Sequence, residues 1–398
     1  MNCKVTGEKI KFIMSFGKMP MANGFLTKKD FKKEFFYELQ VGFNKKNFLF
    51  QVGNHPKSSK IFNDKYPFFT HKSKFMVRHF KEFYRWLEKN YLKKNSNVIE
   101  IGSNDGTFLS FFSKSKYNSY GFEPSLNVAK ISRKKGLNIF AKFFNYENTS
   151  KLIKFKKKID LICAANVICH IPNLKNLIKS IDYLLSRDGV FIFEEPYLGS
   201  MFKRVSYDQI YDAHVFIFSL HSVKSIFNNF GFELIDAVPQ NSHGGSMRYV
   251  IARKNSFEVK KSVKKILAKE VANNLNKLKY WMVFKKQCEI SRNKFRSKIL
   301  KLKKKGKKIC GYAASAKSTT ALNYCGIDKR YIEYIVDSTK EKIGKYTPGT
   351  HIPIKSSKYF KNNYPNYVIL NSWNHKKEIL KKEKVFSNKG GKWISHVK

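Results

Sequence analysis

The chain lacks the features of a membrane-spanning or disulfide-stabilised protein. Its 398 residues contain six cysteines, and no two of them form a C-x-x-C pair. No apolar run approaches the 18 residues needed to cross a bilayer, and the N-terminus has no sustained apolar segment of the secretory type. Free thiols in apolar surroundings fit a reducing compartment. We therefore expect a soluble, cytoplasmic protein with no membrane partner.

Acidic residues and arginine are both scarce. The chain has 29 acidic against 78 basic residues, a formal net charge of +49, and only ten of the basic residues are arginine. Nucleic-acid recognition favours arginine, whose planar guanidinium donates two parallel hydrogen bonds. The lysines are spread along the chain among many Asn, Ile, Phe and Tyr, a mixture typical of an AT-rich genome. We expect no nucleic-acid partner; a surface selected to bind a polyanion is the alternative.

Length and composition indicate several domains. A chain of 398 residues with 42% hydrophobic residues is too long for one small core and too apolar to be disordered throughout. Glycine and proline are absent from 256–304, where apolar residues recur at helical spacing. We predict a loop-rich N-terminal domain over 1–75, an α/β domain over 76–254, a helical arm over 255–304 and a second α/β domain over 305–398.

Strand and helix patterns alternate in both α/β segments. A helix is expected near 76–95, followed by strands at 97–102, 118–123, 137–140, 159–164, 189–194 and 247–253, and then by strands near 308–312, 332–336, 367–370 and 392–395. The spacing between most of these strands suits helical crossovers. The predicted fold class is α/β, with a largely parallel, doubly wound sheet in the first segment and a Rossmann-like unit in the second.

The loop after the first of these strands is the most informative motif. The strand ends at Glu100, and a turn with two glycines leads into a helix start, as in the ligand-binding loops of open α/β sheets. Glu123 ends the next strand about 20 residues on, where a carboxylate takes ribose hydroxyls. The tight G-x-G-x-x-G spacing is absent, and a carboxylate-rich loop suits a cationic cofactor. The sequence thus favours S-adenosylmethionine (SAM) over NAD, with cofactor-binding residues Glu100, Gly102, Asn104, Asp105, Gly106, Glu123, Pro124 and Asn166.

Three histidine-containing segments combine polar residues in ways that a core does not need. His170 follows the strand at 159–164, on the same edge as the loop that starts at Glu100. Tyr211 and His214 precede an aromatic run and form a plausible proton-transfer pair, with a packed histidine as the alternative. The segment 243–248 has two glycines and a rare arginine, which suits either an anion-binding loop or a plain tight turn.

The second α/β segment has a candidate ligand loop of its own. Small residues follow the strand near 308–312, and Ser315 and Lys317 then open a helix, a place that attracts phosphate. The spacing is not that of a Walker A loop. A turn-rich segment over 344–354 follows and could close over the same ligand.

The ordered set of motifs resembles the SAM-dependent sugar C-methyltransferases of deoxysugar pathways. The resemblance covers nearly the whole chain and rests on EIGSNDG (100–106), GFEP (121–124), NVICHIP (166–172), EEPYL (194–198), IYDAH (210–214), HGGSMR (243–248), GYAASAKS (311–318), PGTHIPI (348–354) and NSWN (371–374). It implies a small zinc-binding N-terminal domain, a class I methyltransferase domain and a C-terminal Rossmann-like domain. It also implies methyl transfer to C3 of a nucleotide-linked 4-keto-6-deoxyhexose.

The resemblance assigns roles to particular residues. His214 falls on the family's base and Tyr211 on its tyrosine, and these two with His170 are the expected catalytic residues. Ala213 replaces the family's glutamate, so Asp212, a backbone carbonyl or the substrate must orient the base. The expected substrate-binding residues are Tyr66, Phe68, His243, Gly244, Ser246, Arg248, Tyr312, Ser315, Lys317 and His351. Sugar O-methylation, or a methyltransferase fold that binds RNA or another polyanion, are the alternatives.

The N-terminal segment departs from the family. The four zinc cysteines of the family align with Cys3, Thr6, Asn44 and Asn47, so a single thiol remains. One thiolate cannot hold a structural tetrahedral zinc. We therefore expect that the zinc has been lost and that the chain has no metal site. The expected partner is a nucleotide-linked sugar, and the expected assembly is a monomer or homodimer.

Overall fold

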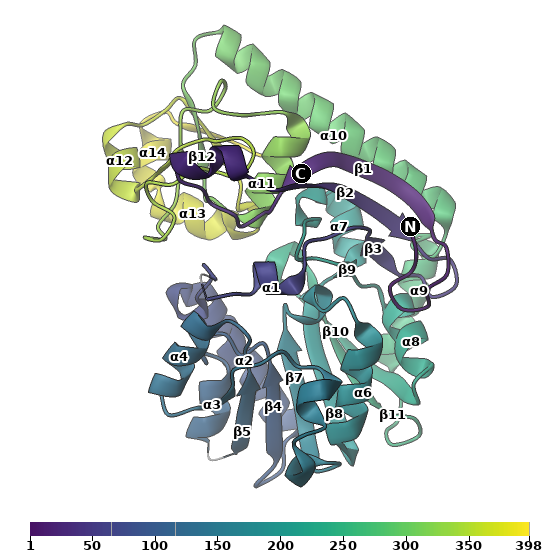
Figure 1. Cartoon of the computed structure of the whole chain (residues 1–398). Coiled ribbons are helices and arrows are strands. Elements are labelled where there is room, and N and C mark those ends of the chain that lie inside the picture. The colour runs from purple at the N-terminus through teal and green to yellow at the C-terminus, as the bar shows by residue number, and fades with distance from the viewer. Residues whose placement is uncertain (65, 116, 398) are drawn as a thin grey trace.

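The computed structural model describes residues 1–64, 66–115 and 117–397. Its named strands form sheets of four, seven and five strands. Figure 1 shows two lobes: the seven-stranded sheet fills the lower one, and the five-stranded sheet lies in the upper one. The N-terminal strands and the long helix α10 (Leu278–Lys304) run side by side along the upper right.

The seven-stranded sheet has the order β10-β11-β8-β7-β4-β5-β6. Its strands are β4 (Asn97–Ile101), β5 (Asn118–Phe122), β6 (Asn138–Phe140), β7 (Ile159–Ala165), β8 (Leu185–Pro196), β10 (Phe232–Gln240) and β11 (Ser246–Arg253). The pairs from β6 to β8 are parallel, whereas β11 is antiparallel to both of its neighbours. The expected doubly wound α/β sheet is confirmed, with one strand more, β10, than the sequence patterns indicated.

Helices cover both faces of this sheet. They are α2 (Lys74–Tyr91), α3 (Leu109–Lys114), α4 (Leu126–Lys134), α5 (Tyr146–Thr149), α6 (Leu174–Leu184) and α8 (Leu220–Asn228), whereas α7 (Leu198–Arg204) packs against the N-terminal strands and α10. In α2 the buried positions Met76, Phe80, Phe83 and Leu87 recur every three or four residues, which places one apolar stripe on the sheet. The hydroxyl of Ser73 caps the helix by accepting the amide of Met76.

The strand β4 lies where the sheet reverses its direction of growth. Its neighbours β5 and β7 extend the sheet to opposite sides, so the loops after β4 and β7 separate and leave a crevice at their carboxyl ends. The loops still touch at their base, because a Cβ at Gly102 would lie 2.4 Å from a methyl group of Val167.

The N-terminal segment is more regular than the expected loop-rich domain. The strands β1 (Lys11–Pro20), β2 (Phe36–Phe43) and β3 (Phe50–Val52) form an antiparallel sheet that β9 (Phe216–Ile217) completes. Aromatic packing drives this: the buried Trp281 of α10 contacts the rings of Phe43 and Phe50. The short helix α1 (Ser58–Ile61) follows and lies between the two lobes (Figure 1).

The remaining elements build the upper lobe. The expected helical arm is a pair, α9 (Lys261–Ala272) and α10, and the parallel sheet β14-β13-β12-β15-β16 follows. Its elements are β12 (Ile309–Tyr312), α11 (Ala316–Cys325), β13 (Ile335–Val336), β14 (Ile354–Lys355), α12 (Ser357–Asn362), β15 (Tyr367–Leu370), α13 (Lys376–Lys382), α14 (Lys384–Asn388) and β16 (Lys392–Ile394). Within the described residues, no helix has the length and apolar character needed to cross a membrane.

Candidate active site

A cavity of about 890 Å³ lies between the carboxyl ends of the parallel strands of the seven-stranded and five-stranded sheets. This volume suits a small-molecule site. Of the residues that the sequence singled out, it is lined by Tyr66, Phe68, Glu100, Gly102, Asn104, Glu123, Pro124, Asn166, His170, Tyr211, His214, His243, Ser315 and Lys317. Residues far apart in the sequence therefore share one site.

The loop after β4 forms one wall. Gly102 and Gly106 have φ values of +69° and +74°, and Asn104 has a φ of +49°, so the loop uses the left-handed backbone that glycine and asparagine tolerate. The carboxylate of Glu123 accepts the amides of Asn104 (3.0 Å) and Ser125 (2.7 Å). Glu123 thus fixes the loop and also faces the cavity.

Three carboxylates gather at this wall. Burial, together with the nearby charges of Asp105 and Glu123, raises the pKa of Glu100 well above its usual range. Among the described residues, the Oε2 atom of Glu100 has no hydrogen-bond partner. A buried carboxylate without a partner is costly, and a cation brought beside it relieves that cost. The sulfonium and ammonium groups of SAM fit this wall.

The segment 66–72 closes over the same loop. Asn104 accepts the amide of Thr70 (3.1 Å) and donates to the carbonyl of Phe68 (3.2 Å). Asp105 accepts the amide (2.9 Å) and the ring Nδ1 (2.7 Å) of His71. Asp105 and Gly106 do not line the cavity. They instead stabilise the loop after β4 and the segment 66–72 that packs over it.

The local geometry fixes the tautomer of His214. Its Nδ1 lies 2.7 Å from the carbonyl oxygen of Gln209, which can only accept, so Nδ1 carries the proton. The lone pair on Nε2 accepts the hydroxyl of Tyr211 at 2.5 Å. Burial, and then the neighbouring His170, hold the pKa of His214 well below its usual range. His214 is therefore a neutral imidazole whose basic nitrogen lies in the cavity wall.

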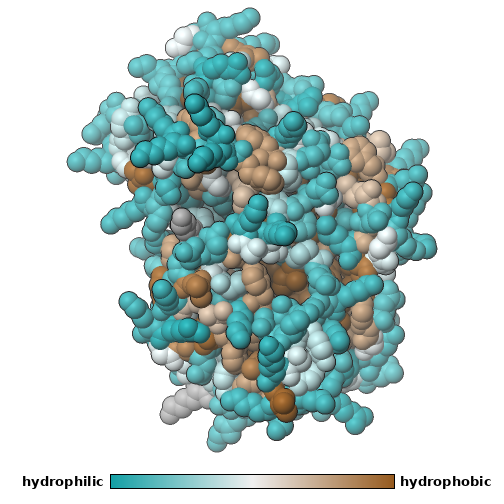
Figure 2. Space-filling model, in the orientation of Figure 1, coloured by the Kyte–Doolittle hydropathy of each residue, from teal (hydrophilic) through white to brown (hydrophobic). Residues whose placement is uncertain are grey.

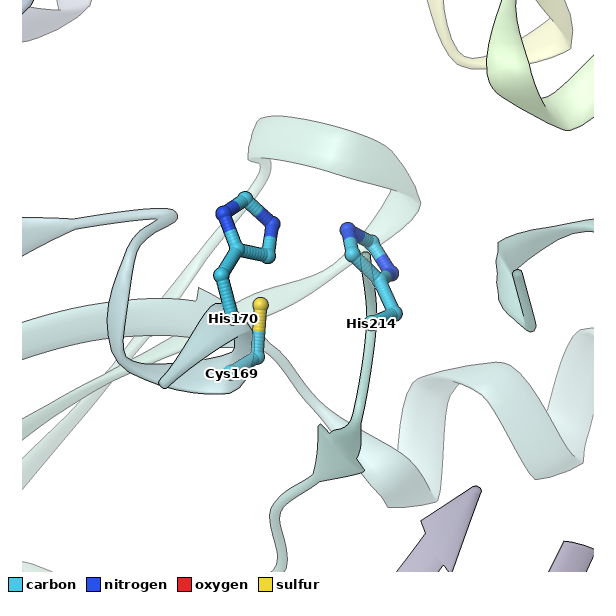
Figure 3. A group of neighbouring side chains, drawn as sticks. All are labelled: Cys169, His170 and His214. Carbon is cyan, nitrogen blue, oxygen red and sulfur yellow. The ribbon is translucent and has the colours of Figure 1, made fainter. Parts of the chain in front are cut away.

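His170 lies opposite His214, with ring centroids 5.3 Å apart. Figure 3 shows the two rings facing each other, with the thiol of Cys169 beside them. Burial lowers the pKa of His170 to about 4. The carboxylate of Glu195 positions this loop, because its Oε1 accepts the amides of Val167 (2.8 Å) and Cys169 (3.1 Å).

Asp212 does not replace the missing glutamate. Its carboxylate accepts the amides of Ala22 (3.1 Å) and Ala213 (2.9 Å) instead of the imidazole of His214. The carbonyl of Ala22 in turn accepts the hydroxyl of Thr319 on α11 (2.8 Å). The sequence left Asp212, a backbone carbonyl and the substrate as groups that could orient His214. In the structure, the backbone carbonyl of Gln209 accepts the hydrogen bond from the histidine.

Arg248 lies outside the cavity. Its guanidinium donates to Glu194 (2.8 Å) and lies over the rings of Phe83 (3.6 Å) and Trp86 (4.7 Å). Glu194 also accepts a ring nitrogen of His79 at 2.7 Å. Arg248 is only 4% exposed, and this buried network joins α2 to the sheet. An arginine placed in this way supports the fold and does not reach a ligand in the cavity.

Four other expected substrate residues also lie away from the cavity lining. Gly244 packs beneath the ring of Trp373, the hydroxyl of Ser246 donates to the carbonyl of Ser242, the hydroxyl of Tyr312 donates to Glu383, and a ring nitrogen of His351 lies 2.7 Å from Glu34. Each of these residues therefore contacts another part of the protein instead of the cavity.

The second sheet contributes residues that the sequence analysis missed. Asp337, Thr339 and Lys342 line the cavity just after β13. Asp337 follows an apolar strand as Glu123 does, so the same signal was present in the sequence. Lys317, which lines the same cavity, lies over Trp373, 5.0 Å from the ring centroid, and burial lowers the pKa of its ammonium group.

The four positions aligned with the family's zinc ligands lie together. The side chain of Asn47 donates to the sulfur of Cys3 at 3.4 Å, and Thr6 and Asn44 lie beside it. Burial raises the pKa of Cys3, but these polar neighbours outweigh burial and bring the pKa below its usual value. A polar cluster around one thiol thus occupies the place expected for the metal.

Comparison with known proteins covers nearly the whole chain. A family model described as "Methyltransferase domain" matches residues 74–237, and one described as "C-methyltransferase C-terminal domain" matches residues 241–397. The C-methyltransferase NovU of Streptomyces niveus is 27% identical over 396 residues, which is 98% of this chain and 94% of that protein.

Solved structures align with about half of the chain. The PH0226 protein of Pyrococcus horikoshii is 14% identical and covers 50% of this chain and 100% of its own, with a TM-score of 0.38. A SAM-dependent methyltransferase of Archaeoglobus fulgidus is 16% identical and covers 44% and 93%, with a TM-score of 0.37.

Proposed function

Because the chain is a SAM-dependent methyltransferase of the C-methyltransferase family, we propose that it methylates the carbon next to the ketone of a nucleotide-linked keto-deoxysugar. One observation carries the proposal: the lone pair of a neutral His214 lies in the wall of the cavity that the carboxylate-rich loop also lines. A base in the same cavity as the cofactor loop suits removal of a proton from carbon.

The methyl donor belongs on the wall formed by Glu100, Gly102 and Glu123. When bound, SAM supplies an electrophilic methyl group on a sulfonium. The backbone of Gly102 permits close approach, while the Oε2 atom of Glu100 is available to a cationic group. We assign this role to the domain over 76–254.

The proton of the sugar carbon passes to Nε2 of His214 once the hydroxyl of Tyr211 has turned from that nitrogen to the ketone oxygen. Its Nδ1–H bond to the carbonyl of Gln209 keeps the ring oriented and stabilises the imidazolium that forms. The electron pair left on the carbon delocalises onto the ketone oxygen. Tyr211 and His170 are the hydrogen-bonding groups for that oxygen, since both line the cavity next to the base. Holding both reactants in place contributes roughly 7–11 kcal/mol to such a reaction.

The nucleotide end belongs at the second sheet, in the domain over 305–398. Ser315 caps α11, and the buried ammonium group of Lys317 follows in its first turn. A helix N-terminus with a buried cation favours a phosphate group. Tyr66 and Phe68 line the cavity from the opposite side and suit contacts with the sugar.

The decisive experiment incubates the protein with SAM and a panel of nucleotide-linked keto sugars, with mass spectrometry as the readout. In D₂O without SAM, the proton next to the ketone should exchange. His214→Ala should keep S-adenosylhomocysteine binding but slow exchange by ~10²–10⁴-fold. His55→Ala is the control, because His55 is not among the residues that line the cavity.

Two results would change the assignment. Full exchange in His214→Ala would move the base elsewhere, with His170 next in line. Methyl transfer without any exchange would favour a hydroxyl acceptor, and the protein would then be a sugar O-methyltransferase.

A further inference from the structure

Three metal-binding side chains converge in the cavity wall. The sulfur of Cys169 and a ring nitrogen from each of His170 and His214 lie within 4.8 Å of one another. They come from two separate segments, the turn after β7 and the stretch just before β9. Figure 3 shows a nitrogen of each ring turned toward the other ring, with the thiol on the same side.

Each imidazole has a ring nitrogen that can bind a metal. His214 has its proton on Nδ1, at the carbonyl of Gln209, so Nε2 offers a lone pair. His170 has a buried Nε2 atom for which the described part of the chain provides no hydrogen-bond partner. A ring nitrogen of His170 lies within 4.8 Å of a second nitrogen and a sulfur, so the cluster offers three donor atoms to one metal.

The donor set selects a class of metal. One thiolate and two imidazoles suit Zn²⁺ or Co²⁺ in tetrahedral geometry, with the fourth position open. Bond lengths of ~2.0–2.3 Å require donor atoms roughly 3.5 Å apart, so the side chains must close by about 1 Å. The carboxylate of Glu195 accepts the amide of Cys169 and so helps to orient this ligand.

We propose that Cys169, His170 and His214 form a binding site for zinc or another divalent transition metal, and that metal binding inhibits methyl transfer. The metal–sulfur bond replaces the S–H bond, and the proton leaves to solvent. The lone pair of His214 then bonds the metal, gives up its hydrogen bond from Tyr211, and cannot accept a proton from the sugar. Binding stands on the geometry alone, whereas inhibition rests on the proposed function.

Cobalt titration of the full, metal-free chain tests the binding. We expect one Co²⁺ per chain, with the visible bands of tetrahedral cobalt and a thiolate-to-cobalt charge-transfer band. Cys169→Ser should abolish the charge-transfer band, and His170→Ala should weaken binding by more than the ~10–100-fold typical of a residue that only orients a ligand. Cys3→Ser is the matched control, because Cys3 is the thiol at the other candidate position, and it should retain the full spectrum. Binding of S-adenosylhomocysteine shows that each variant is folded.

The outcomes separate the two parts of the proposal. The metal site is wrong if the wild-type protein shows no charge-transfer band, or if the band survives Cys169→Ser and is lost in Cys3→Ser. In the methyl-transfer assay, Zn²⁺ should inhibit the wild type reversibly, and a chelator should restore activity. Full activity with the metal bound would overturn the inhibition. If no keto sugar is methylated, the proposed function fails while the cobalt spectra still decide the site.

Discussion

Two adjacent glutamates on β8 show how strongly surroundings control a carboxyl group. Glu194 and Glu195 are both fully buried. Although burial disfavours its charge, Glu194 has hydrogen bonds from His79, Arg248 and Ser242, and these lower its pKa to about 2. Glu195 accepts only neutral groups, and burial raises its pKa to about 7. Between about pH 2 and pH 7, Glu194 is therefore ionised while its sequence neighbour Glu195 is neutral.

Replacing each glutamate by glutamine should change stability in opposite directions. Glu194 has a lowered pKa, so its charge stabilises the fold above pH 4.5 and loses this effect as the pH falls toward 2. Glu194→Gln should therefore destabilise the protein at pH 8, on the scale of about 3–5 kcal/mol for a broken buried pair. Glu195 has a raised pKa, so ionising it costs stability as the pH rises from 4.5 through 7. Glu195→Gln removes that cost and should stabilise the protein by roughly 2–3 kcal/mol at pH 8 relative to pH 4.5.

Urea unfolding of the three proteins across pH 4.5 to 8 provides the measurement. The difference between Glu195→Gln and wild type should grow with pH. Parallel curves would show that folding leaves the pKa of Glu195 unshifted and would contradict the assigned environment.

At the residue scale, the local sequence predicted which side chains line the cavity better than it predicted how those side chains are oriented. Glu100, Glu123 and His170 were predicted to share one site because each follows a parallel strand, and the carboxyl ends of parallel strands lie at one edge of the sheet. All three line the cavity. The carbonyl of Gln209 was not identifiable, since any residue supplies a carbonyl and its direction depends on the folded loop. Arg248 misled because the sequence does not reveal that Glu194 and two aromatic rings surround it.

At the element scale, long periodic segments were predictable and short ones were not. The crossover pattern predicted most strands of the seven-stranded sheet, and the absence of Gly and Pro predicted the helical arm. The strands β1 to β3 were missed because they bury aromatic side chains against α10, a contact that no local period encodes. The two-residue strands β13 and β14 are too short for any pattern to define both ends.

One carboxylate anchors the helical arm to the lower lobe. Glu270 of α9 accepts the amides of Leu220 (2.7 Å) and His221 (3.1 Å) at the start of α8, the ring Nδ1 of His221 (2.6 Å) and the hydroxyl of Tyr197 (2.8 Å). A buried acceptor at a helix N-terminus satisfies amides that have no partner within the helix.

Removing this anchor should destabilise the arm and the sheet together. Glu270→Ala leaves several buried donors without an acceptor, so we expect a loss of about 3–5 kcal/mol in the free energy of unfolding. Lys269→Ala, at an exposed position next to it, should change stability by less than about 0.5 kcal/mol. Chemical denaturation measures both variants, and equal effects would mean that the anchor contributes nothing.

The cluster around Cys3 permits a prediction about metal content. Only one of its four polar groups is a thiol, and amide and hydroxyl groups are poor zinc ligands. Wild type and Cys3→Ser should therefore contain the same amount of zinc by elemental analysis after dialysis. Stoichiometric zinc that disappears in Cys3→Ser would show that this cluster is a metal site after all.

At the scale of the whole molecule, charge and shape have separate origins. Figure 2 shows hydrophilic residues over most of the face in view, with hydrophobic patches scattered between them. The net charge of +49 is distributed along the chain and does not mark the cavity, whose cofactor wall is acidic. The cavity arises from the way the two lobes meet.

The hydrogen bond between Trp373 and Asp208, called the joint below, helps to set how the two lobes are placed relative to each other. Trp373, after β15 of the upper lobe, donates its indole N–H at 2.7 Å to the buried Asp208, in the segment between α7 and β9. Gly244 lies against the same ring with a φ of +84°, and a Cβ there would come within 2.2 Å of it. The missing side chain at Gly244 is therefore what lets the tryptophan reach its partner.

Gly244→Ala should weaken binding of the nucleotide-linked sugar without weakening binding at the cofactor wall. The new methyl group displaces Trp373 and breaks its bond to Asp208, a hydrogen bond to a charged group that is worth about 1.5–3 kcal/mol. A nucleotide-linked sugar that contacts both lobes should then bind roughly 10–100-fold more weakly. S-adenosylhomocysteine, on the wall of the lower lobe, should bind as before. Gly306→Ala is the matched control: it has a φ of +69° and nothing within 4 Å of an added Cβ, so it shares the backbone strain without the clash. Calorimetry with each ligand measures both variants, and an equal loss in the two would assign the effect to backbone strain and not to the joint.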